Sequence, residues 1–253
     1  MTDHTWQLTT PLDAIVFDCD GTLSRLEGID ELAQVNDVEH EVAVLTQKAM
    51  AVTGITPDLY AQRLSLVQPT EAQIKKVGHD YFYERTPDVL EVIRIFQRFN
   101  KVIYIMSAGV NPAVIMFAEH LGIPKLQVFA VDLEFDSAGC YLDFDHQSPL
   151  TTPGGKRHLV ELLHKKHRNI MHVGDGMNDI DAKDVVTRFV GYGGVFYREK
   201  IAELCDYYIL STSMSSLLPL AFTEKETQNL SEGERQFYDA GLSFIERGEV
   251  LIK

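Results

Sequence analysis

The segment IVFDCDGTLS, residues 15–24, places the strongest constraint on what this chain can fold into. Its first part, Ile15 to Phe17, is a short run of β-branched and aromatic residues that stops before a glycine turn, which is typical of a buried strand. Asp18 and Asp20 therefore lie at the carboxyl end of a strand, where open α/β sheets bind their ligands. Because side chains alternate along a strand, both carboxylates can face one pocket.

Two carboxylates this close repel each other, so they need a cation between them unless one of them holds a proton. A hard divalent cation such as Mg²⁺, which prefers oxygen ligands, fits such a pair. Taken alone, the Asp-x-Asp pattern is equally compatible with an acidic turn after a strand. The rest of the chain decides between these two interpretations.

Strand-like and helix-like segments alternate through most of the chain. Apolar runs predict further strands at residues 102–106, 128–133, 169–173, 186–191 and 206–210. Residues 133–144 alternate around Ser137-Ala138-Gly139, which predicts a β-hairpin. Strand–helix alternation with right-handed crossovers indicates an α/β fold, with a doubly wound, mostly parallel sheet and a Rossmann-like core.

An early region breaks this alternation. No strand-like run interrupts residues 26–82, which show amphipathic helical stretches instead. We interpret residues 26–82 as a small helical cap inserted into a discontinuous catalytic core, residues 1–25 and 83–220. Residues 221–253 are charged and helix-prone, so they predict a C-terminal helical extension.

Composition excludes several partners. The chain carries 23 Lys plus Arg against 37 Asp plus Glu, a net charge of −14, so nucleic acids and anionic membranes would meet no basic field. A small phosphorylated ligand stays compatible, because a bound cation can reverse the field inside one cleft. Cys19, Cys140 and Cys205 form no CxxC pair, which favours reduced thiols and a cytoplasmic protein. Residues 1–11 lack the apolar core of a signal peptide, and no apolar run approaches the ~18 residues of a membrane span.

Polar or acidic side chains follow three of the predicted strands. Asp18 and Asp20 follow the first strand, Ser107 follows the second, and Asp175 and Asp179 follow a later one. Parallel strands joined by right-handed crossovers bring such ends to one edge of the sheet. We therefore expect these side chains to form a single site.

Four motifs, in their order along the chain, resemble those of the haloacid dehalogenase-like hydrolase superfamily. They are Asp18-x-Asp20-Gly21-Thr22, Ser107 after a strand, Lys156 after Gly154-Gly155, and Gly174-Asp175-Gly176-Met177-Asn178-Asp179. The resemblance runs from residue 13 to about residue 220. Each motif alone is a moderate signal, but four in the right order are a strong one. The resemblance implies a phosphomonoester hydrolase that uses Mg²⁺.

The resemblance also implies a role for each matching residue. Asp18 would be the nucleophile that forms an aspartyl-phosphate, and Asp20 the general acid and later the general base. Asp18, Asp175 and the backbone carbonyl of Asp20 would hold the metal, with Asp179 supporting them or the metal's waters. The residues that would bind the phosphoryl group are Ser107, Ala108, Gly109, Lys156 and Asn178.

A narrower resemblance concerns the substrate. Residues 27–33, EGIDELA, and residues 62–69, QRLSLVQP, are similar to segments of the phosphoserine phosphatases. In that family the glutamate matching Glu27 pairs with the substrate ammonium, and the arginine matching Arg63 grips its carboxylate. The methionine matching Met50 packs over the substrate. The resemblance thus implies hydrolysis of phosphoserine to serine and phosphate, and a place in serine biosynthesis.

Two alternatives stay open at this point. A protein with the same fold could hydrolyse another small phosphomonoester or transfer its phosphoryl group to another alcohol. A catalytically silent, ligand-binding relative is the second alternative, although such a protein would normally lack an aspartate or the lysine that this chain retains. Asp20 argues against dehalogenase chemistry, because a halide leaving group needs no proton. The oligomeric state and the role of the C-terminal extension do not follow from the sequence.

Overall fold

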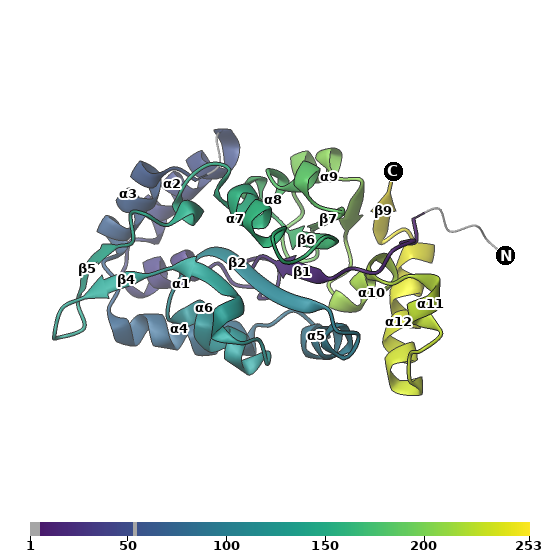
Figure 1. The fold of residues 1–253 in the computed structure, drawn as a ribbon. Coiled ribbons are helices and arrows are strands. Elements are labelled where there is room, and N and C mark those ends of the chain that lie inside the picture. Colours follow the sequence, from purple (N-terminus) through teal and green to yellow (C-terminus); the bar gives the residue numbers. More distant parts are fainter. Residues whose placement is uncertain (1–5, 53–54) are drawn as a thin grey trace.

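A seven-stranded sheet forms the centre of the molecule in the computed structural model, which describes residues 6–52 and 55–253 (Figure 1). Neighbouring strands are parallel except for the last pair, β8 and β9, which are antiparallel. The strand order is β3 (Val128–Val131), β2 (Val102–Val110), β1 (Ala14–Phe17), β6 (Ile170–Gly174), β7 (Arg188–Tyr192), β8 (Tyr207–Ile209) and β9 (Val250–Ile252). The predicted doubly wound, mostly parallel sheet is therefore confirmed.

Helices cover both faces of this sheet (Figure 1). One face carries α5 (Val89–Arg98) and α6 (Ala113–His120), and the other carries α7 (Gly155–Leu163), α8 (Met177–Ile180) and α9 (Glu199–Leu204). Strand β1 lies between β2 and β6, and all four of its residues are buried. Burial on both faces explains why its sequence, AIVF, is apolar throughout instead of alternating. Among the described residues, no helix is long and apolar enough to cross a membrane.

Between β1 and α5 the described part of the chain forms four helices, which lie beside one end of the sheet (Figure 1). Local sequence fixes where some of them begin: Thr56 caps one helix, and Thr70 with Gln73 forms a capping box at the next. The helices are α1 (Gly28–Val35), α2 (Glu39–Val52), α3 (Pro57–Val67) and α4 (Glu71–Tyr83). Ile74, Val77 and Tyr81 form the buried face of the last of these, with the spacing of a helical stripe.

The remaining elements between β3 and the C-terminal region are short. The predicted hairpin is confirmed as β4 (Leu133–Phe135) and β5 (Tyr141–Phe144), which pair antiparallel. Short 3₁₀ turns occur at Lys125–Gln127, Pro149–Thr151, Lys183–Val185 and Met214–Ser216.

The C-terminal region differs in part from its prediction as a helical extension. It contains the expected helices, α11 (Glu224–Thr227) and α12 (Glu232–Glu246), after α10 (Leu217–Ala221). It also returns to the sheet, because β9 pairs with β8 and becomes its edge strand. A three-residue strand carries too little periodicity to predict, and its partner lies about forty residues earlier in the chain.

Candidate active site

The carboxyl ends of β1, β2 and β6 border a cavity of about 120 Å³, and residues of helices α1, α3 and α4 line its other side. Every predicted site residue whose side chain is described lines this cavity. These residues are Asp18, Asp20, Glu27, Arg63, Ser107, Ala108, Gly109, Lys156, Asp175, Asn178 and Asp179. Met50 belongs to α2, and its side chain lies outside the described residues.

Three buried carboxylates meet at the core side of the cavity. Asp18 directly follows β1, Asp175 directly follows β6, and Asp179 lies in α8. One oxygen from each lies within 4.8 Å of the others, so the trio could hold a metal ion. Burial raises the pKa of Asp18 and of Asp175, and the charge of Asp179 adds to the effect in both. A hard cation such as Mg²⁺ fits this donor set, because it would offset the repulsion of three close carboxylates.

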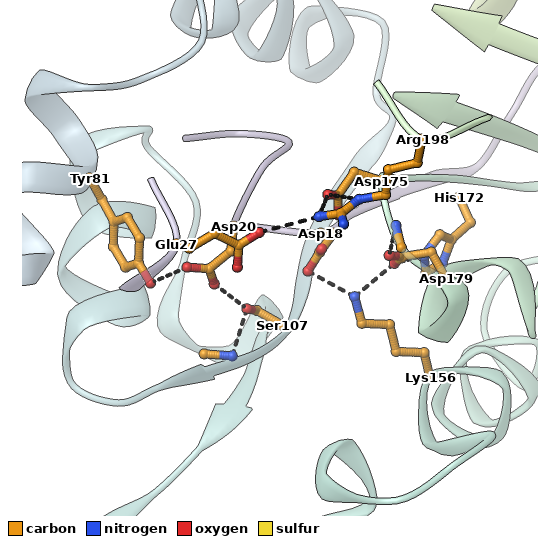
Figure 2. Close-up of polar contacts among 12 residues, drawn as sticks. Asp18, Asp20, Glu27, Tyr81, Ser107, Lys156, His172, Asp175, Asp179 and Arg198 are labelled. Carbon is orange, nitrogen blue, oxygen red and sulfur yellow. Dashed lines mark hydrogen bonds and ion pairs between the residues drawn. The ribbon is translucent and has the colours of Figure 1, made fainter. Parts of the chain in front are cut away.

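A glycine turn makes room for this trio. Gly21 has a φ of +68°, and a Cβ on it would lie 2.7 Å from Oδ2 of Asp175. A side chain at residue 21 would therefore both strain the backbone and displace a carboxylate. The side chain of Asp20 points toward Tyr81 and Ser107, on the side away from Asp18 and Lys156 (Figure 2).

Lys156 connects two of the carboxylates. Its Nζ lies 2.8 Å from Oδ1 of Asp18 and 2.7 Å from Oδ1 of Asp179, and the side chain is 4% exposed. Burial by itself would lower the pKa of Lys156, but Asp179 and Asp18 outweigh it and raise the pKa. The ammonium is thus charged in the site, close to where a phosphoryl group bonded to Asp18 would carry negative charge.

His172, a residue of β6, supports Asp179 from inside the core. Its Nε2 lies 2.8 Å from Oδ1 of Asp179, the same oxygen that Lys156 contacts (Figure 2). Burial raises the pKa of Asp179, but Lys156 and His172 lower it to about 2. Burial lowers the pKa of His172, and because the ionised carboxylate of Asp179 can only accept, Nε2 is the donor in this contact.

The side chain of Asp20 accepts three hydrogen bonds from the described residues, and Figure 2 draws those from Tyr81 and Ser107. Its Oδ1 accepts from the backbone N–H of Gly28 at 2.6 Å and from the Tyr81 hydroxyl at 2.7 Å. Its Oδ2 accepts from Ser107 Oγ at 3.2 Å, and that Oγ accepts from the N–H of Gly109 at 2.9 Å. Residues 107–109 lie within β2, which is longer than predicted and changes register with β3 between Met106 and Val110.

Arg198, in the loop between β7 and α9, joins the acidic side of the cavity. Its Nε and Nη2 donate to Oδ2 of Asp175 at 3.1 and 2.8 Å, and Nη2 lies 3.5 Å from Oε1 of Glu27. Burial, Asp20 and Asp175 raise the pKa of Glu27 well above its usual range, and Arg198 opposes them. Glu27 therefore lies where an additional cation would be stabilising.

Arg63 approaches the cavity from α3 and is 8% exposed. Among the described residues no carboxylate lies within salt-bridge distance of it, and its Nε has no hydrogen-bond partner. Its guanidinium lies 5.7 Å from the ring centre of Tyr60, whose hydroxyl donates to the carbonyl of Ala108 at 3.0 Å. Nearby, Asn178 Oδ1 accepts from the N–H of Ile55, another link between cap and core.

Sequence reasoning did not assign roles to Tyr81, His172 and Arg198. Each had a partial signal: Tyr81 follows the apolar stripe of α4, His172 interrupts an apolar strand, and Arg198 comes after the end of β7. These signals indicate burial or a sheet edge. They do not identify the carboxylate that each side chain contacts, because those contacts join segments far apart in the chain.

Comparisons with known proteins agree with this geometry. Residues 12–182 match the family model of the haloacid dehalogenase-like hydrolases. The phosphoserine phosphatase of Bos taurus is 34% identical over 199 residues, 78% of this chain and 88% of the bovine protein. The Homo sapiens phosphoserine phosphatase gives the same values. A solved phosphoserine phosphatase structure, a phospho-aspartyl intermediate analogue, has a TM-score of 0.72 and 25% identity, over 83% of this chain and 98% of that one.

Proposed function

This chain belongs to the haloacid dehalogenase-like hydrolases, and within them to the phosphoserine phosphatase family, and we propose that it hydrolyses phosphoserine to serine and phosphate. One observation carries the proposal. A single cavity holds the Asp18–Lys156–Asp179 cluster on its core side and two groups of opposite charge, Glu27 and Arg63, toward the cap. Phosphoserine carries a phosphate, an ammonium and a carboxylate, which match these three features.

In the first step, a carboxylate oxygen of Asp18 attacks phosphorus. The new O–P bond gives an aspartyl-phosphate, and the bond from phosphorus to the serine oxygen breaks. Asp20 donates its proton to the departing serine oxygen. Lys156, 2.8 Å from Asp18, orients the nucleophile and offsets the charge on the transferring group.

In the second step, water attacks the phosphorus of the aspartyl-phosphate. Asp20, now ionised, takes a proton from that water, the bond to Asp18 breaks, and inorganic phosphate leaves. Ser107 Oγ and the N–H groups around Ala108 and Gly109 would donate to the phosphoryl oxygens, and Asn178 would complete this side of the pocket. The proton taken by Asp20 restores the acid for the next cycle.

A divalent metal fits the acidic trio, and we assign it as Mg²⁺. Asp18, Asp175 and the backbone carbonyl of Asp20 would hold it, with Asp179 beside them. When bound, Mg²⁺ offsets the negative charge of the phosphoryl group and of the surrounding carboxylates.

Substrate selection would depend on Glu27 and Arg63. Arg63 is a buried cation with no carboxylate of the described chain beside it, so a substrate carboxylate is a fitting partner. Glu27 shares the site with Arg198 at 3.5 Å, and an ammonium there would pair with the same carboxylate. An enzyme that produces free serine from phosphoserine acts in serine biosynthesis. The three free cysteines, Cys19, Cys140 and Cys205, favour a location in the cytoplasm.

A screen of phosphomonoesters with Mg²⁺ tests the proposal. Phosphoserine should have a higher kcat/KM than phosphoethanolamine, which lacks the carboxylate, and than phosphoglycerate, which lacks the ammonium. Sugar phosphates and an aryl phosphate complete the panel, and the Asp18→Asn variant controls for contaminating phosphatases. If a sugar phosphate is hydrolysed as well as phosphoserine, the assigned substrate is wrong while the phosphatase assignment remains. Absence of activity on every ester would overturn both.

A further inference from the structure

Tyr81, a residue of the cap, contacts the carboxylate of Asp20, which is proposed as the general acid. It lies on α4, is fully buried, and donates its hydroxyl hydrogen to Oδ1 of Asp20 at 2.7 Å. In Figure 2 its ring approaches Asp20 from the side opposite to Asp18 and Lys156. The ring packs against Phe117 of the core helix α6, with centroids 5.7 Å apart.

The backbone of α1 is shaped around this hydroxyl. Gly28, the first residue of α1, has no side chain, and a Cβ on it would lie 2.2 Å from Oη of Tyr81. The N–H of the same glycine donates to the same Oδ1 at 2.6 Å. Any larger residue at position 28 would therefore displace the Tyr81 hydroxyl from Asp20.

The two oxygens of Asp20 have different surroundings. Oδ1 is held by two donors on the cap side, Gly28 and Tyr81. Oδ2 faces β2, where it accepts from Ser107 and would lie 2.8 Å from a Cβ on Gly109. Only Oδ2 is therefore directed toward the strand end at which a phosphoryl group would bind.

We propose that Tyr81 is a positioning residue for Asp20. Its hydroxyl holds Oδ1 of Asp20, and Oδ2 is then the oxygen that gives its proton to the departing alcohol. The inference rests on the proposed function, because it assumes that Asp20 protonates a leaving group. A carboxylate oxygen accepts, so the Tyr81 hydroxyl is the donor in this contact. Placement of the acid then depends on a cap helix as well as on the turn after β1 that carries it.

The Tyr81→Phe variant tests this proposal, because phenylalanine keeps the ring packing and removes only the hydroxyl. We measure kcat/KM for phosphoserine and for p-nitrophenyl phosphate, since this constant reports the steps up to departure of the alcohol. We expect a roughly 10-fold loss on phosphoserine, a part of the ~10²–10⁴ that a general acid contributes. The loss on p-nitrophenyl phosphate should stay below about twofold, because that leaving group needs little protonation.

Two further variants make the test specific. Gly28→Ala should show the same selective loss on phosphoserine. The double variant of Tyr81→Phe and Gly28→Ala should be no worse than either single variant, because both changes break the same contact between Tyr81 and Asp20. Tyr60→Phe removes another buried cap hydroxyl, one bonded to the Ala108 carbonyl, and any loss should be equal on both esters.

The results separate this inference from the proposed function. The wild-type rate on phosphoserine tests the function, and Asp20→Asn gives the reference pattern for loss of the acid. An equal loss on both esters in Tyr81→Phe, or no loss on phosphoserine, would overturn the positioning role while leaving the function standing. If Gly28→Ala does not lower kcat/KM for phosphoserine more than for p-nitrophenyl phosphate, the role proposed for the Tyr81 hydroxyl is likewise wrong. A wild type inactive on every ester would overturn both.

Discussion

Lys101 and Lys156 are both buried, but they lie at opposite ends of the parallel strands. Lys101 immediately precedes β2, has a fully buried side chain, and pairs with Glu226 of α11 at 2.6 Å. Its Nζ also donates to the carbonyl of Leu12 and lies 5.0 Å from the ring centre of Phe222. Lys156 lies at the carboxyl ends of the strands, between two aspartates.

The two environments shift the lysine pKa in opposite directions. Burial lowers the pKa of Lys101, and Glu226 recovers only part of it, whereas Asp179 and Asp18 raise the pKa of Lys156 despite its burial. Lys101 pairs with a single carboxylate, that of Glu226, and this ion pair joins the C-terminal region to the core. A lysine among more carboxylates than it can neutralise leaves a site that still attracts cations, and a bound cation would then favour a phosphoryl group there. A buried lysine by itself thus does not identify a functional site. A buried lysine with more carboxylates around it than its own charge can neutralise does.

The largest expected effect is at the carboxyl end. Asp18→Asn should reduce turnover on the order of 10⁴-fold or more, because it removes the proposed nucleophile with little change in size. Thermal unfolding should stay unchanged or shift upward, because the change also removes repulsion from Asp175 and Asp179. Measurable turnover close to wild type, in the presence of excess Mg²⁺, would contradict the assignment of Asp18.

The next effect is that of Lys156→Met. Loss of one charged donor at the transferring group should cost about 10²–10³-fold in kcat. It should also destabilise the fold, because Asp18 and Asp179 lose their shared cation. We expect added Mg²⁺ to raise the melting temperature of this variant more than that of the wild type; an equal shift in both would indicate that the trio does not bind the metal.

Arg63→Ala should have a smaller and selective effect. It should raise KM for phosphoserine by roughly 10- to 150-fold, the value of a lost charge-assisted hydrogen bond of about 1.5–3 kcal/mol. Phosphoethanolamine, which has no carboxylate, should show almost no change. A similar rise of KM for both esters would mean that Arg63 supports the cap and does not contact the substrate carboxylate.

The smallest effect on activity is expected at Lys101. Lys101→Met should leave kcat and KM within about twofold, but lower the free energy of unfolding by about 1–3 kcal/mol, because Glu226 loses its partner. The double variant with Glu226→Gln should regain part of this loss, since an unpaired buried charge is the costly state. Denaturant unfolding of the single and double variants measures both values. A large loss of activity in the single variant, with the fold intact, would mean that the two ends of the strands are coupled.

The local sequence determined most of the fold and the chemical character of the site. The apolar run before Asp18 requires a buried strand, and a polar residue directly after such a run lies at the sheet edge. Right-handed crossovers then bring Asp18, Ser107 and Asp175 to one edge whatever the loops between them do. The motif order therefore predicted the family, and the comparisons confirm it.

Only the tertiary structure decided which groups touch. The contacts of Asp20 with Tyr81, of Asp175 with Arg198 and of Lys101 with Glu226 span 61, 23 and 125 positions. A hydrogen bond needs its two atoms within about 3 Å, whereas periodicity places a side chain only on a face of its own element. Strand β9 was missed for the same reason, because three residues form a strand only where an open sheet edge meets them. Periodicity along the chain thus predicts the elements, and packing between distant elements sets the distances on which the chemistry depends.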